Sequence, residues 1–97
     1  MEPGGLNKEE EVPATVIAFL ATARAAIEAS RGSAYESFTA VSCGSQCVAG
    51  TNWFVKVQTA ASGACIHLRI YEDFDENMEV HGTQLDNLTL ESPLAYF

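Results

Sequence analysis

The stretch SQCVAGTNWFVKV, residues 45–57, contains a turn that runs directly into an alternating strand. Trp53, Val55 and Val57 alternate with mostly polar positions, and this period of two is typical of a strand with one buried face. The Gly-Thr-Asn sequence before the strand favours a turn. Residues 47–49 are a cysteine, a valine and an alanine, where turns usually carry polar residues. The stretch therefore predicts a hairpin with an unusually apolar tip.

The period of two continues on both sides of this hairpin. We predict four strands, over residues 36–48, 52–59, 64–72 and 78–90. The connections between them are short, including a turn at 61–63 and an acidic loop at 73–77. Short connections imply that neighbouring strands run antiparallel. The apolar ending LAYF is suited to docking on the same domain.

Residues 13–30 have the pattern of a helix instead. Pro13 suits the first turn of a helix, and Gly32 suits its end. One apolar stripe follows the helical spacing: Val16, Phe19, Leu20, Ala23 and Ile27. One helix and one antiparallel sheet predict a two-layer α+β domain. We expect a single domain over residues 1–97, in which residues 1–12 form a mobile arm.

Length, charge and cysteine content narrow the class of protein. The 97 residues suffice for one core, and the formal net charge of −8 argues against binding to nucleic acid or to an anionic membrane surface. We find no apolar run of the roughly 18 residues that a membrane span needs. The start lacks the basic and apolar regions of a signal peptide. Three cysteines are an odd number and do not make a disulfide framework. We therefore expect free thiols and a cytoplasmic protein.

Candidate residues for catalysis or metal binding are few. Cys65 and His67 share one face of a strand, but residues of these types are more often ordinary half-buried members of a sheet. Cys43 and Cys47 would join them in a zinc site only if about 13 Å of extended strand were bent. The acidic loop begins like a calcium loop but has Met78 where glycine is needed. We therefore predict no catalytic residue, no metal and no cofactor.

The apolar tip itself matches a known signature. Gln46-Cys47-Val48-Ala49-Gly50 fits the Q-x-V-x-G pattern of the cystatins, which inhibit papain-like cysteine proteases. Further segments resemble the stefin branch of that family: MEPGGLN, VAGTNWFVKV, IHLRIY, TQLD and LAYF. The resemblance spans the chain, and it implies a cystatin-like fold with a single helix on a four- to five-stranded antiparallel sheet.

The resemblance also implies how the protein acts. An arm with Gly4 and Gly5, a first hairpin at 46–50 and a second hairpin would together form a wedge for a protease cleft. Stefins commonly carry Leu-Pro in the second hairpin, whereas this chain has Phe74 and Asp75 in a shorter loop. The implied partners are papain and cathepsins of the L, S, H and B type, bound reversibly and tightly.

Three questions stay open on the sequence alone. Cys47 is either a small apolar contact or an exposed thiol. The chain is either a monomer or a dimer, formed by strand exchange or by a Cys47 disulfide. The alternatives to inhibition are an interaction module of the same fold that has lost inhibitory activity, and a small metal-binding protein.

Overall fold

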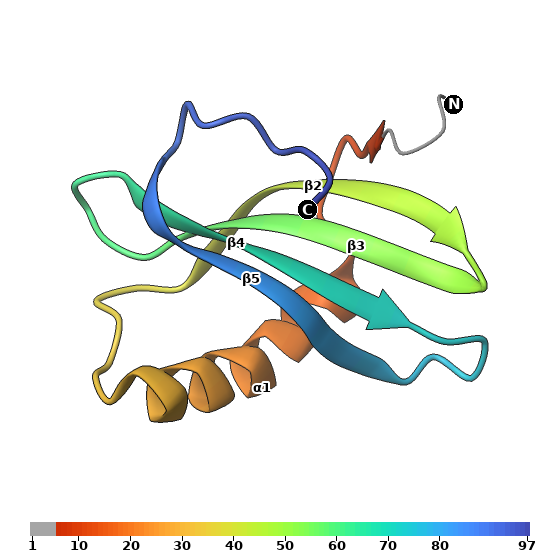
Figure 1. The fold of residues 1–97 in the computed structure, drawn as a ribbon, viewed down its shortest axis with the longest axis horizontal. Coiled ribbons are helices and arrows are strands. Elements are labelled where there is room, and N and C mark those ends of the chain that lie inside the picture. The colour runs from red at the N-terminus through yellow and green to blue at the C-terminus, as the bar shows by residue number, and fades with distance from the viewer. Residues whose placement is uncertain (1–5) are drawn as a thin grey trace.

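The computed structural model describes residues 6–97 (Figure 1). In this range the chain forms one helix, α1 (Ala14–Arg31), and five strands: β1 (Asn7–Lys8), β2 (Thr39–Val48), β3 (Gly50–Gln58), β4 (Ala64–Glu72) and β5 (Met78–Thr89). The strands build one antiparallel sheet in the order β1-β2-β3-β4-β5, and α1 lies across one of its faces. The predicted α+β class and cystatin-like fold are confirmed.

The helix follows the predicted pattern closely. It starts after Pro13 and ends at Gly32, whose left-handed φ of 77° lets its N–H bond the Glu28 carbonyl at 3.0 Å. Its buried residues are the apolar stripe without Phe19: Val16, Leu20, Ala23 and Ile27. Facing them, the sheet contributes the alternating apolar residues of three strands: Cys43, Val55, Val57, Ile66, Leu68 and Ile70. Each fully buried aliphatic side chain here contributes about 2 kcal/mol to stability.

The second face of the sheet is also covered, although the sequence pattern predicted only one apolar face. Residues 90–97 return over it. Phe54 lies under this segment with its ring centroid 5.7 Å from that of Tyr96 and 5.5 Å from that of Phe97. The buried Lys56 ammonium donates to the carbonyls of Leu90 at 2.7 Å and Ser92 at 2.5 Å. The sequence pattern alone is compatible with an exposed lysine at position 56. The returning segment of residues 90–97 buries it.

Strand β1 lies within the segment for which the sequence predicted a mobile arm. Asn7 pairs with Ser45 and Lys8 with Gly44 at the edge of β2, and the Glu9 N–H bonds the Cys43 carbonyl at 3.0 Å. Residues 7–9 are therefore part of the sheet. A strand of two residues is too short to leave a periodic signal in the sequence, which is why it was not predicted.

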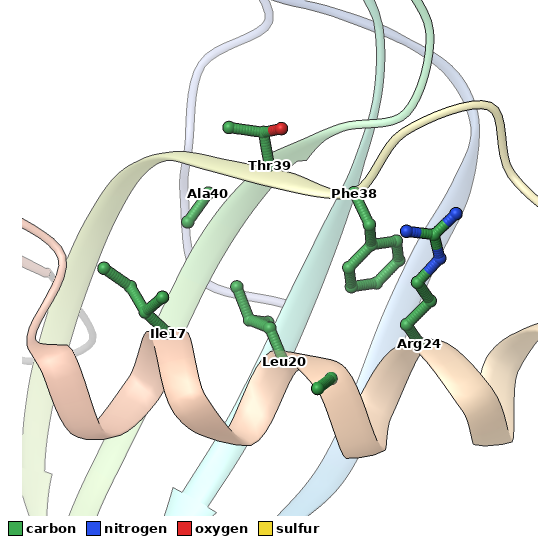
Figure 2. A pocket seen from close by; sticks show the side chains of 7 residues that line it. Ile17, Leu20, Arg24, Phe38, Thr39 and Ala40 are labelled. Atoms are coloured by element: carbon green, nitrogen blue, oxygen red, sulfur yellow. The ribbon is translucent and has the colours of Figure 1, made fainter.

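A hollow of about 440 Å³ opens between α1 and the start of β2 (Figure 2). Ile17 and Leu20 line it from the helix, Phe38 lines it from the residue before β2, and Ala40 lines it from β2 itself. Arg24 borders it, but its guanidinium is engaged by Glu28 at 3.1 Å and by the Tyr35 carbonyl at 2.9 Å.

In the described part of the chain, no helix has the length and apolar character that crossing a membrane requires.

Candidate functional site

Two hairpins end side by side at one end of the sheet (Figure 1). The first is the turn between β2 and β3, where Val48 pairs with Gly50. The second is the loop of residues 73–77 between β4 and β5. Thr51 pairs with Glu72 across β3 and β4. Thr51 adjoins the first turn and Glu72 adjoins the second loop, so the two hairpins lie next to each other. We call residues 46–50 and 73–77 the tip.

The backbone of the first hairpin depends on Gly50. Its φ of 106° is a conformation that residues with a side chain rarely adopt. A Cβ at this position would also overlap the Glu72 carbonyl oxygen and would lie 3.0 Å from the Tyr71 hydroxyl. Glycine is thus required both by the turn and by the close approach of β4.

The side chains of the first hairpin face outward. Val48 is 43% exposed, and Cys47 is exposed as well. Gln46 is held to its cross-strand partner, since its Oε1 accepts from Asn52 Nδ2 at 3.3 Å. The hairpin therefore presents a small apolar surface, which agrees with the apolar tip that the sequence predicts.

The second loop is organised by one carboxylate. Asp73 Oδ1 accepts from the backbone N–H of Asp75 at 2.9 Å and from that of Asn77 at 3.0 Å. These hydrogen bonds, those of Asn77 above all, lower the pKa of Asp73. Phe74 stands out from this compact loop with 82% of its surface exposed. An aromatic ring so exposed is a candidate contact for a partner.

Two residues outside the predicted set connect the hairpins. Trp53 on β3 donates its indole N–H to Glu72 Oε1 on β4 at 2.9 Å. Tyr71, also on β4, donates its hydroxyl to the carbonyl of Ala49 at the turn. Sequence reasoning missed both because these contacts join distant residues. A strand register could have pointed to them, since Trp53 and Tyr71 lie next to the tip in their strands.

Gly4 and Gly5, which the resemblance to stefins assigns to the wedge, lie outside the described residues. The chain reaches the sheet at Leu6 and Asn7. Since β1 runs antiparallel to β2, Leu6 lies on the side of Asn7 nearer to the first hairpin. Leu6, the first described residue, thus lies toward the tip end of the sheet.

The cysteines and histidine considered for chemistry do not converge. Cys43 faces α1 in the core, while Cys65 and His67 are buried on the opposite face of the sheet. The structure therefore does not bring the residues of the zinc alternative together. Burial raises the pKa of Cys43 to about 12 and also raises that of Cys65, so neither is an activated thiol. Among residues 6–97, no three potential ligands are grouped to hold a metal ion.

One helix packed on an antiparallel sheet, with paired hairpins at a common tip, defines a cystatin-like α+β domain. No protein-family model matches the chain. Several curated proteins are similar to it in sequence. Cystatin-A1 of Dictyostelium discoideum is 47% identical over 57 residues, which cover 59% of this chain and 58% of that protein. Cystatin-A and Stefin-1 of Mus musculus are 33% and 31% identical, in each case over the full length of both chains.

The full-length similarity to Cystatin-A and Stefin-1 establishes the family. The chain belongs to the cystatins and, within them, to the stefin branch.

Proposed function

We propose that this chain is a reversible, tight-binding inhibitor of papain-like cysteine proteases that fills the active-site cleft with its tip. The observation that carries the proposal is the meeting of two hairpins at one end of the sheet, each with an exposed apolar side chain, Val48 and Phe74. The similarity to cystatins and a stefin supports the same conclusion.

The proposed inhibition needs no catalytic group on this chain, so we expect it not to be an enzyme. The hairpin at 46–50 would lie near the protease nucleophile and exclude substrate. Its small side chains let the backbone approach the cleft closely, and its hydrogen-bonded turn loses little conformational entropy on docking. Gly4 and Gly5 would occupy the non-primed side of the cleft.

The second loop would supply the contact on the primed side. Phe74 offers an exposed aromatic ring in place of the Leu-Pro pair common in stefins. Asp75 adds a negative charge beside it, which we expect to disfavour proteases with an acidic surface at this position. The loop thus retains an apolar contact while changing the preference among cathepsins.

Titration of papain and of a cathepsin L-like protease with the purified protein tests the proposal. We expect stoichiometric, reversible inhibition of at least one of them. Absence of inhibition at micromolar concentration would contradict it and favour the alternative, an interaction module that has lost inhibitory activity.

The arm is tested separately by a pair of charge-changing variants. We expect Gly4→Glu to weaken inhibition more sharply than Glu10→Ala, because a carboxylate at position 4 would have to enter the cleft. Equal effects of the two variants would count against a role for the arm.

The state of the chain in solution belongs to the same proposal. We expect a cytoplasmic monomer, with its thiols kept reduced. Size-exclusion chromatography with and without reductant checks this. A dimer that disappears with reductant would indicate a Cys47 disulfide, and one that persists would indicate exchange of strands through the 46–50 hairpin.

A further inference from the structure

Tyr71 supports the first hairpin from the neighbouring strand. It lies on β4, opposite Asn52 of β3 and Glu79 of β5. Its hydroxyl donates to the carbonyl oxygen of Ala49, although 22 residues separate the two in the sequence. Ala49 is the apex of the turn, because the residues on either side of it, Val48 and Gly50, are paired with each other. The bond therefore fixes the apex from outside the hairpin.

The missing side chain at Gly50 provides the room for this contact. A Cβ there would lie 3.0 Å from the Tyr71 hydroxyl and 3.1 Å from its Cε1. Real Cβ atoms rarely come so close to another heavy atom. The phenol ring thus lies directly against the turn backbone, and a side chain at position 50 would displace it.

The ring is also fixed by β5. His81 stacks on Tyr71 with 5.1 Å between ring centroids and 20° between ring planes. The His81 Nε2 lies 3.2 Å from Glu79 Oε2 on the same strand. Stacking is a favourable arrangement of aromatic rings, so His81 favours the orientation in which the hydroxyl reaches Ala49. Two strands therefore contribute to the conformation of one turn.

We propose that Tyr71, held by His81, is a positioning residue that preorganises the 46–50 hairpin for binding. Its effect on inhibition rests on the proposed function, whereas its effect on the turn does not. A hairpin that is ordered before binding loses less entropy when it docks. Loss of one hydrogen bond at the apex is expected to weaken binding roughly 3- to 10-fold, mainly through faster dissociation.

Tyr71→Phe is the test, because it removes only the hydroxyl and keeps the stacked ring. We would measure backbone 15N order parameters of the free protein and the rates of papain binding and release. The matched control is Tyr35→Phe, at the far end of the sheet. We expect lower order parameters at residues 48–51 and faster release for Tyr71→Phe, and neither change for Tyr35→Phe.

His81→Ala provides a second arm, since it removes the stacking partner and leaves the hydroxyl. It should also lower the order parameters at residues 48–51. Unchanged order parameters in both variants would overturn the positioning role. A looser turn with unchanged release would overturn its importance for inhibition. If the unmodified protein inhibits neither papain nor the cathepsin L-like protease, the proposed function fails, and the order parameters still decide whether Tyr71 positions the turn.

Discussion

Gly50 is the residue at which backbone conformation and packing are most tightly coupled. We predict that Gly50→Ala lowers the free energy of unfolding by about 2–4 kcal/mol, since strained φ and steric overlap each cost about 1–2 kcal/mol. Gly32→Ala is the control. Gly32 has a φ of 77° with nothing within 4 Å of its missing Cβ, so only backbone strain is expected. Urea denaturation of both variants measures the difference, and equal losses would contradict the overlap at Gly50.

The three cysteines differ in accessibility, and this gives a prediction at the same scale. Cys47 is exposed, whereas Cys43 and Cys65 are buried. We expect a thiol reagent such as Ellman's reagent to modify one cysteine rapidly in the native protein and all three in urea. Cys47→Ser should abolish the rapid phase. Rapid modification of that variant would show that a buried cysteine is accessible in solution.

At the scale of elements, the loop between β4 and β5 carries a residue that we expect to matter for protease binding and not for the stability of the fold. Phe74 is 82% exposed, so its removal is expected to change stability by less than about 0.5 kcal/mol. If its ring contacts the protease, Phe74→Ala should weaken inhibition of papain by roughly 10-fold or more. Leu85→Ala, at an exposed apolar residue of β5 away from the tip, is the control. Similar inhibition by both variants would argue that Phe74 is outside the interface.

The elements also show what a sequence can predict. The helix was predicted to within a residue at each end and the strands to within three, because the 3.6- and two-residue periods of buried residues are local signals. Strand β1 was missed because two residues carry no period. The burial of Lys56 was missed because its ammonium is covered by a segment from the far end of the chain. Tyr71 was missed for a different reason, because its contact with Ala49 depends on the register between β3 and β4, which the residue pattern of a single strand does not give.

At the scale of the whole molecule, a buried histidine on the second face of the sheet leads us to expect a fold that is sensitive to acid. His67 is only 1% exposed, and its Nδ1 lies 3.3 Å from Gln84 Oε1. Its Nε2 has no hydrogen-bond partner within the described chain. Burial lowers the pKa of His67, the charge of Lys56 lowers it further, and the Gln84 contact opposes both. The native protein therefore keeps this imidazole neutral at a pH where the unfolded chain would protonate it.

This difference has a definite sign. An unfolded histidine binds a proton near pH 6.5, while folded His67 does so only at a lower pH, so the unfolded state binds more protons between the two values. The contribution of His67 to stability is complete above about pH 6.5 and is lost as pH falls toward the lowered pKa. Asp73 and Glu28 also have lowered pKa values, from 3.8 and 4.5, so they titrate below this window.

We therefore predict that the free energy of unfolding falls between pH 7.5 and pH 5, and that His67→Gln reduces this slope. The variant is expected to be less stable at pH 7.5, because it changes a buried side chain, but the slope does not depend on that offset. Urea denaturation at half-unit pH intervals measures both proteins. If His67→Gln loses stability with acid as steeply as the unmodified protein, the acid sensitivity arises elsewhere and His67 is not its source.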